Sequence, residues 1–359
     1  MTTRRIRRGA GIAGVLLLAA TALTACAEEP GAGGGDPEEA TVAFLMPDLA
    51  STRYELYDAP LFEAKMKELC GGCTVIYQNA DSDAAAQQRQ ADSAIAEGAS
   101  VIVLDPVDSK AAAQIVQTAQ SQDVKVIAYD RPIPDKPADF YVSFDNKAIG
   151  SSIAQSLLDD LDEQGAEGGV LQVNGSPTDA AAQLIKAGID EAVEASGRQE
   201  LAEYDTPDWQ PEKAQQWVAG QITKFDGDIA GVIAANDGTG GGAIAAFKAA
   251  GAPVPPVTGN DAELTAVQRI INGDQYNTIS KPIKTVAEAA AEVAWQMVQG
   301  EEPEPTTTLF DTPSQLFEPT VVTQENLKEV IFGPDGVLDP AEVCAGEYAA
   351  GCRTLGIES

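Results

Sequence analysis

From residue 41 onward, short apolar runs alternate with longer amphipathic stretches. Apolar runs without a polar face are typical of strands that a parallel sheet buries on both sides. The predicted strands are 42–46, 74–78, 101–104, 125–129 and 140–144, followed by a second series at 169–174, 231–235 and 255–259. The predicted helices between them are 61–69, 84–97, 110–121, 149–161, 180–195, 211–223 and 241–250. This pattern predicts an α/β fold with two doubly wound parallel-sheet lobes.

Polar residues follow the predicted strands directly, at the edge where such sheets bind ligands. These residues are Asp48, Asp105, Asp130 and Arg131 in the first series, and Ser176, Asn236, Asp237, Asn260 and Asp261 in the second. Asp and Asn also favour turns and helix N-caps, which accounts for part of the pattern. Arg131 is not explained in this way, because arginine is a poor turn former with a fixed fork of donors.

The N-terminal segment has the pattern of an export signal. Four arginines lie among the first eight residues, and an apolar run covers residues 11–23. The run ends in Leu23-Thr24-Ala25-Cys26. Small residues before a cysteine are typical of lipoprotein signals, so we expect residues 1–25 to be removed and Cys26 to be acylated. An ordinary signal peptide that happens to contain a cysteine is the alternative. Residues 26–40 are rich in Gly, Pro, Asp and Glu and predict a flexible acidic spacer, so we expect a lipid-anchored protein on the extracytoplasmic face of the cell membrane.

Charge and composition exclude several classes of function. The 23 basic and 55 acidic residues give a formal net charge of −32. Such a surface repels nucleic acid and anionic lipid, so the only expected membrane contact is the N-terminal lipid. The chain contains no histidine, which excludes Ser-His-Asp catalysis and the commonest zinc sites. We expect no metal site and no enzyme, although catalysis by carboxylates alone stays open.

Beyond Cys26 the cysteines form two local pairs, Cys70 with Cys73 and Cys344 with Cys352. An even number of cysteines in an exported protein predicts disulfides. Cys70-Gly-Gly-Cys73 also matches a redox motif, but reactive cysteines of that kind lie at a helix N-terminus. This pair follows a predicted helix, which favours a structural bridge.

A glycine-rich segment, residues 238–242, follows a predicted strand and opens a helix, with Asp261 about twenty residues further on. This spacing resembles a dinucleotide-binding motif. However, Asn236 and Asp237 separate the strand from the glycines, and the segment lies in the second series of strands. Close packing of a helix on the sheet is the favoured interpretation, and no cofactor is expected.

Six motifs occur in order between residues 41 and 330: residues 128–131, 140–146, 175–179, 235–244, 259–263 and 280–283. Together they resemble the xylose-binding members of the type I periplasmic sugar-binding proteins of ABC importers. The family fold consists of two α/β lobes, joined by three crossover segments, that close on a sugar.

The resemblance implies hinges near 143–146, near 279–282 and within 307–316. The implied organisation is a first lobe of 41–145 plus 282–311, a second lobe of 146–281 plus 312–335, and a disulfide-containing tail at 336–359. The implied sugar-binding residues are Arg53, Tyr54, Asp130, Arg131, Trp209, Asn236, Asp261 and Lys281. Their chemistry suits a polyhydroxyl ligand, because charged and amide groups bond to its hydroxyls and an indole ring covers its C–H face. Packing in the core is the alternative for Trp209.

Three positions depart from the xylose pattern. Leu56 stands where the family has a lysine, and Ala180 and Ala181 stand where it has two asparagines. A missing amide would leave a hydroxyl unpaired, or make room for a larger or differently substituted sugar.

We therefore expect a monomeric solute-binding protein that captures a monosaccharide, xylose or a related pentose or hexose, and delivers it to an ABC permease. One alternative is a sensor that presents the sugar to a receptor. Another is a carbohydrate-cleaving enzyme that uses Asp130 and Asp261 as its carboxylates. Arg131 and Lys281 disfavour that enzyme, because nearby cations lower carboxyl pKa values.

Overall fold

The computed structural model describes residues 37–333 and 336–357. The predicted signal peptide (1–25) and Cys26 lie outside these residues. At the end of the predicted spacer, Pro37–Glu39 forms a 3-10 turn, and the carbonyl oxygen of Pro37 lies 3.5 Å from Cys73 Sγ. The described chain thus begins a few residues before its first strand.

A seven-stranded sheet forms the centre of the first lobe in the part of the chain that the structure describes. Its order is β10-β11-β5-β4-β3-β1-β2, and every neighbouring pair is parallel except β10 with β11. The strands are β1 (Thr41–Met46), β2 (Thr74–Asn79), β3 (Ala99–Leu104), β4 (Lys125–Tyr129), β5 (Phe140–Phe144), β10 (Thr307–Leu309) and β11 (Thr312–Phe317). The carboxyl ends of β1, β3 and β4 therefore lie along one edge.

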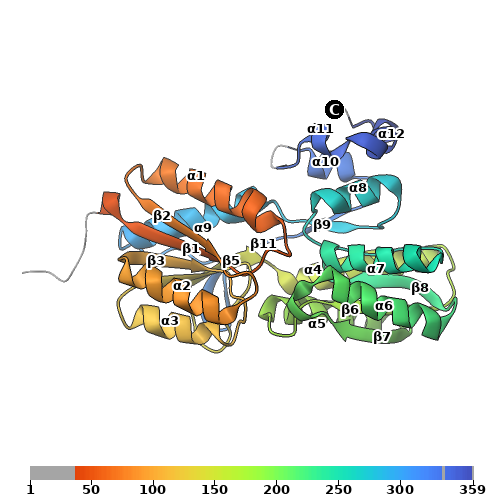
Figure 1. Cartoon of the computed structure of the whole chain (residues 1–359), viewed down its shortest axis with the longest axis horizontal. Coiled ribbons are helices and arrows are strands. Elements are labelled where there is room, and N and C mark those ends of the chain that lie inside the picture. The colour runs from red at the N-terminus through yellow and green to blue at the C-terminus, as the bar shows by residue number, and fades with distance from the viewer. Residues whose placement is uncertain (1–36, 334–335, 358–359) are drawn as a thin grey trace, which may run out of the picture. The chain divides into compact units, whose positions relative to one another are not determined.

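Helices cover both faces of this sheet (Figure 1). The helices α1 (Ala59–Leu69) and α9 (Ile283–Val298) pack together on one face, and α2 (Ala84–Ala96) and α3 (Ala112–Gln120) lie on the other. Along β1, Phe44 belongs to the apolar cluster beneath α1 and α9, whereas Leu45 belongs to the cluster beneath α2 and α3. This alternation explains why β1 is apolar at every position from Val42 to Met46.

The second lobe is built on a smaller parallel sheet of order β7-β6-β8. Its strands are β6 (Gly169–Asn174), β7 (Glu200–Asp205) and β8 (Ile229–Ala234). The helices α4 (Asn146–Glu163) and α5 (Ala180–Ser196) pack as one pair, and α6 (Pro211–Phe225) and α7 (Asp237–Ala250) as another. Residues of the sheet contribute to a separate apolar cluster with each pair, so helices cover both faces here too.

Within the described ranges the chain passes between the lobes three times. It crosses after β5, between β9 (Thr278–Ser280) and α9, and between β11 and β12 (Thr320–Val322), with β9 and β12 paired antiparallel. The boundary expected between residues 311 and 312 is wrong, because Thr312–Phe317 pairs with β5 in the first lobe's sheet, Ser314 opposite Tyr141. The third crossover is therefore at residues 318–319.

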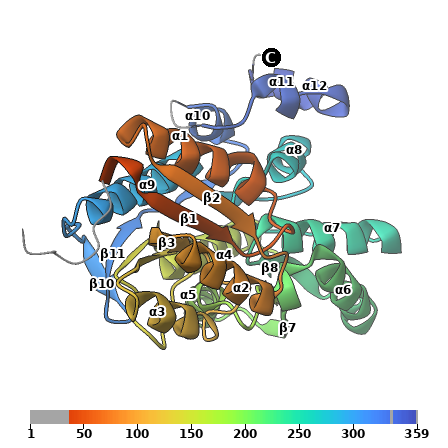
Figure 2. The ribbon, with the colours of Figure 1, turned by 60° about the vertical axis from the view of Figure 1, so that its left-hand side comes forward.

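The C-terminal residues pack on the second lobe. They form α10 (Leu327–Ile331), α11 (Pro340–Val343), a 3-10 turn (Gly346–Tyr348) and α12 (Ala349–Thr354). Figure 2 shows these elements near α8 (Leu264–Asn272), with which they form an apolar cluster that includes Val267, Ile271 and Val343. Cys344 and Cys352 are joined by a disulfide in this cluster, and Cys70 and Cys73 are joined at the C-terminal end of α1.

Two local expectations differ from the structure. The strand expected at 255–259 is reduced to a single bridge between Val257 and Val232, because Pro255 and Pro256 have no N–H to donate to a ladder. The strand β7 was not predicted, since the charged residues Glu200, Glu203 and Asp205 interrupt its apolar ones and none of its residues is fully buried at this edge of the sheet. No helix among the described residues has the length and apolar character needed to cross a membrane.

Candidate functional site

All eight residues expected to bind a ligand line a single cavity between the lobes. The further lining residues are Ser51, Asn146, Asp179, Ala181, Ile185 and Asn260. The space left among the side chains is about 30 Å³. That space holds one or two water molecules, so a sugar ring would have to separate side chains that now touch.

The buried carboxylate of Asp58 holds the guanidinium of Arg53 in place. Arg53 precedes the π-helical segment Tyr54–Asp58, and its guanidinium donates twice to Asp58, from Nε at 3.0 Å and from Nη2 at 2.7 Å. The hydroxyl of Tyr129 also donates to Asp58. This paired geometry directs Arg53 Nη1 toward Asp130 at 3.3 Å and Asp261 at 3.8 Å. Arg53 thus reaches from the first lobe to a carboxylate of the second.

Asp130 is the residue directly after β4, with a left-handed backbone (φ 57°). Its carbonyl oxygen accepts hydrogen bonds from the hydroxyls of Tyr141 and Ser143, both at 2.8 Å. Its carboxylate accepts a hydrogen bond from Tyr54 at 3.2 Å. These bonds hold the strand end in the conformation that turns Asp130 and Arg131 toward the cavity.

Arg131 lies among three buried carboxylates. Its Nη2 is 2.7 Å from Asp48, and its Nε is 3.4 Å from Asp105 and 3.2 Å from Asp179. Asp48 and Asp105 follow strands of the first lobe, whereas Asp179 precedes α5 in the second. The ion pair with Asp179 therefore joins the two lobes.

Lys281 lies in the crossover between β9 and α9. Its Nζ is 2.6 Å from Asp261 and 3.8 Å from Asp130. Asp261, with φ 102°, belongs to the second lobe, and Asp130 belongs to the first. One lysine in the hinge region thus contacts a carboxylate from each lobe.

Two asparagines complete the second lobe's side of the cavity. Asn236 is the N-cap of α7, and its Oδ1 accepts hydrogen bonds from the N–H and the hydroxyl of Thr239, each at 2.9 Å. Asn260 is 2% exposed, and its Oδ1 has no hydrogen-bond partner among the described residues. A buried acceptor without a partner is costly, so Asn260 is suited to accept a hydrogen bond from a ligand hydroxyl.

Trp209 belongs both to the apolar core and to the cavity wall. Its indole Nε1 donates to Asp179 Oδ2 at 2.9 Å. The ring lies against Gly175, where an added Cβ would come within 2.1 Å of it. Glycine after β6 is therefore what allows the indole to reach the cavity, so Trp209 both packs in the core and lines the cavity.

The charges that line the cavity balance. Among the described residues the lining contains three cations and three carboxylates: Arg53, Arg131, Lys281, Asp130, Asp179 and Asp261. Burial alone would raise the pKa of Asp130, but the cations beside it, Arg53 first, lower this pKa below its usual value. Burial raises the pKa of Asp179, an effect that Arg131 and Trp209 partly offset. The lining thus offers many charged hydrogen-bonding groups, and three further buried carboxylates, Asp48, Asp58 and Asp105, lie directly behind its arginines.

The set of implied sugar-binding residues did not include Asp179 or Asn260. Asn260 was named among the polar residues at the strand ends but not carried into that set, and Asp179 lies at the end of the loop that follows β6, where the same rule could have found it. The role of Asp179 depends on the placement of the first lobe's Arg131, which no local pattern contains.

The glycine-rich segment 238–242 is part of the first turns of α7, which begins at Asp237 and not at residue 241 as predicted. An added Cβ at Gly240 would lie 2.6 Å from the carbonyl oxygen of Thr258, and one at Gly242 would lie 2.3 Å from that of Pro211. These glycines allow close backbone packing, in agreement with the favoured interpretation.

One group of acidic residues in the described chain has metal-ligand spacing: Asp190, Glu200 and Glu203. All three are exposed, and Glu203 is paired with Lys186. Exposed carboxylates with a lysine partner are an ordinary feature of a protein surface. This group also lies outside the cavity lining.

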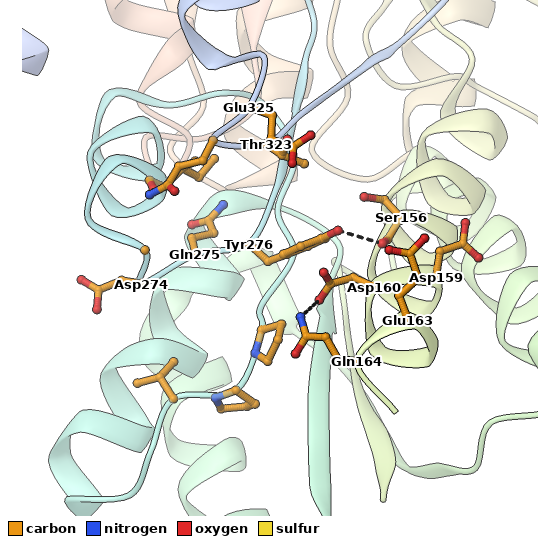
Figure 3. Close-up of a pocket in the computed structure, with 16 residues that line it drawn as sticks. Ser156, Asp159, Asp160, Glu163, Gln164, Asp274, Gln275, Tyr276, Thr323 and Glu325 are labelled. Carbon is orange, nitrogen blue, oxygen red and sulfur yellow. Dashed lines mark hydrogen bonds between the residues drawn. The ribbon is translucent and has the colours of Figure 1, made fainter. Parts of the chain in front are cut away.

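A larger hollow, about 660 Å³, lies elsewhere on the second lobe (Figure 3). Tyr276 lies across it and donates to the carbonyl oxygen of Ser156 at 3.0 Å. Among the described residues its lining includes five carboxylates and no lysine or arginine: Asp159, Asp160, Glu163, Asp274 and Glu325. Its lining, as far as the structure describes it, therefore lacks the cations that the cavity between the lobes has.

Comparison with known proteins places these features in a family. The model of the periplasmic binding protein domain matches residues 42–302. The D-xylose-binding periplasmic protein of Escherichia coli (strain K12) is 33% identical over 304 residues, which cover 82% of this chain and 90% of that protein. A multiple sugar-binding periplasmic receptor of Rhizobium radiobacter is 28% identical, with 82% of this chain and 90% of that protein covered.

Among solved structures, an ABC transporter solute binding protein from Clostridium phytofermentans with bound β-D-glucose aligns with a TM-score of 0.76. It is 25% identical, and the alignment covers 84% of this chain and 99% of that one. Its two-lobed α/β fold agrees with the one described above. The chain belongs to the periplasmic binding protein domain family and has the type I fold of that family.

Proposed function

We propose that this protein binds one neutral monosaccharide between its lobes and delivers it to the membrane permease of an ABC importer. The relatives are named for binding xylose and multiple sugars, and the aligned structure holds glucose. They are transport or receptor binding proteins, which supports a binding function and not an enzyme.

The observation that carries the proposal is the cavity lining. Three cations, three carboxylates and the unpartnered Oδ1 of Asn260 surround one space, with the indole of Trp209 at its side. A hydroxyl both donates and accepts, so a polyhydroxyl ligand can bond to cations and carboxylates together. The lining has no excess of positive charge, and Asp48, Asp58 and Asp105 lie behind its arginines. This favours a neutral sugar over a sugar acid or a sugar phosphate, whose negative charge would be buried without compensation.

The identity of the sugar is left open by this lining. Leu56 is 60% exposed and is not among the cavity residues, whereas Ala181 lines the cavity directly. Of the departures from the xylose pattern, Ala181 is therefore the one placed to change specificity.

A carbohydrate-cleaving enzyme would require a carboxyl that keeps a proton near neutral pH to act as general acid. Asp130 does not meet this requirement, because Arg53, Lys281 and Arg131 lower its pKa. Asp130 is therefore unsuited to the acid role that the enzyme alternative gives to it or to Asp261, which supports binding over cleavage.

Binding is tested by a thermal-shift screen of the protein against pentoses, hexoses and polyols, followed by calorimetry with the sugars that raise the melting temperature. Arg131→Ala and Asp261→Ala should each weaken binding by about tenfold to a hundredfold, because a charged hydrogen-bond partner is lost in a buried site. Arg89→Ala and Asp162→Ala are matched controls, since these side chains are 68% and 63% exposed on the surface. Unchanged affinity in both cavity variants would place the binding site elsewhere.

We also propose that the protein is held at the extracytoplasmic face of the membrane by a lipid on Cys26 and acts there as a monomer. The small residues before Cys26 and the polar spacer after it support this anchor. Cys26→Ser should move the protein from the membrane fraction to the soluble fraction after export, whereas Ala27→Ser should not. Retention of the Cys26→Ser protein in the membrane fraction would refute the anchor.

A further inference from the structure

One wall of the cavity has no hydrogen-bonding side chain. Ala181 and Ile185 lie one turn apart on α5, so both point to the same face of the helix. They line the cavity and are 5% and 3% exposed. The indole of Trp209, whose Nε1 is already bonded to Asp179, adds to this apolar surface.

Two backbone N–H groups at the start of α5 already donate to acceptors within the protein. The N–H of Ala180 donates to Ser109 Oγ at 3.0 Å, and the N–H of Ala181 donates to Asp179 Oδ1 at 2.7 Å. These two amides would otherwise be donors beside the wall, as helix N-termini usually are. A ligand hydroxyl placed against Ala181 and Ile185 would therefore lose its water without a partner in return.

We propose, building on the monosaccharide-binding function above, that the sugar turns an edge without a hydroxyl toward Ala181 and Ile185. In aldopyranoses each of the first four carbons carries a hydroxyl, so this edge is C5 with its substituent. The ligand class is then an aldose whose C5 carries a hydrogen or a methyl group, that is, an aldopentopyranose or a 6-deoxyhexose. A hexose with a hydroxyl on C6 binds more weakly.

Two matched series of sugars test this preference by calorimetry. The first is D-glucose, 6-deoxy-D-glucose and D-xylose, and the second is D-galactose, 6-deoxy-D-galactose and L-arabinose. In the series that binds, the 6-deoxy sugar or the pentose should bind at least about tenfold more tightly than the hexose, because an unpaired buried hydroxyl is costly. Equal or tighter binding of the hexose in that series would overturn the proposal while leaving the monosaccharide function intact. Absence of heat and of thermal stabilisation with every sugar would instead refute the function itself.

Substitution of the wall provides a second test. Ala181→Asn, or the smaller Ala181→Ser where asparagine prevents folding, places a donor and an acceptor on the apolar surface. The ratio of hexose to 6-deoxyhexose affinity should rise by about tenfold in these variants. Ala187→Asn introduces the same side chain on the same helix outside the cavity lining and should leave the ratio unchanged. If folded Ala181 variants keep the wild-type ratio, the wall does not select the sugar edge and the proposal fails.

Discussion

Arg131 of the first lobe forms an ion pair with Asp179 of the second, with Nε and Oδ2 3.2 Å apart. The same oxygen of Asp179 accepts a hydrogen bond from Trp209 Nε1 at 2.9 Å, and its other oxygen caps α5 through Ala181 N–H at 2.7 Å. One buried carboxylate therefore connects a first-lobe cation, the indole ring and the helix that forms the apolar wall. The placement of all three depends on it.

Asp179→Asn should weaken sugar binding by about tenfold, because it removes the charge that pairs with Arg131 and leaves one amide oxygen to serve both Trp209 and Ala181. Calorimetry measures the affinity, and the fluorescence of Trp209 reports its altered environment. Asp162→Asn is the matched control, because its carboxylate, which pairs with Arg198, is exposed at the surface and lies outside the cavity lining. Wild-type affinity in Asp179→Asn would show that the link between the lobes does not position the site.

The lobes also form direct hydrogen bonds with each other through residues outside the cavity lining. Ser109 N–H donates to the carbonyl oxygen of Thr178 at 3.0 Å, beside the bond from Ala180 N–H to Ser109 Oγ. Since the space inside is about 30 Å³, a sugar can enter only after the lobes separate. We expect rotation about the three crossovers, so that small-angle scattering gives a smaller radius of gyration with saturating sugar than without it. An unchanged radius in a sample with proven binding would contradict this hinge motion.

Part of the site was predictable for the same physical reason as the strands. Parallel strands bring their carboxyl ends to one edge, so Asp48 after β1 meets Arg131 after β4 regardless of the sequence between them. This rule also indicated Asp130, Asn236 and Asp261, whereas Arg53, Tyr54, Trp209 and Lys281 were expected only from the resemblance to the sugar-binding family. It also predicts that residues after strands matter more than the helices that connect them.

Local sequence patterns predict neither the pairing of β11 with β5 nor the ion pair of Asp179 with Arg131. Thr312–Phe317 is a short run that could pair in either lobe, and its partner β5 is far away in the chain. The pair Arg131–Asp179 joins residues from different lobes, so it depends on how the lobes meet. Strand β7 was missed because an edge strand with half-buried polar residues lacks the apolar signal.

Reduction of the two disulfides should lower the melting temperature by only a few degrees. The bridges join residues that are 3 and 8 positions apart, and short loops remove little entropy from the unfolded chain, about 1–3 kcal/mol each. Differential scanning calorimetry with and without reductant measures the effect. Peptide mapping under non-reducing conditions should recover Cys70 with Cys73 and Cys344 with Cys352, and a cross-pair such as Cys73 with Cys344 would refute the assignment.

The last prediction concerns two carboxyls close to cavity residues, the buried Asp237 next to Asn236 and the partly buried Glu263 two residues after Asp261. Burial, reinforced by the charge of Asp261, raises the pKa of Asp237 to about 7, although Arg269 opposes this. Burial, followed by the charges of Asp237 and Asp261, raises the pKa of Glu263 to about 8. Between about pH 4 and pH 8 the folded protein therefore holds protons that the unfolded chain releases. The free energy of unfolding should fall as the pH rises through this window and level off above it.

Asp237 provides the sharper test, because it is fully buried and accepts hydrogen bonds from Thr278 Oγ1 at 2.8 Å and Gln275 Nε2 at 2.8 Å. Asparagine can keep part of this hydrogen bonding but cannot titrate. In urea unfolding at a series of pH values, Asp237→Asn should therefore lose stability less steeply than the wild type between pH 5 and pH 8. Asp92→Asn, an exposed position on α2, should follow the wild-type curve. A wild-type free energy of unfolding that stays flat or rises over this interval would mean that these carboxyls ionise without cost in the folded protein.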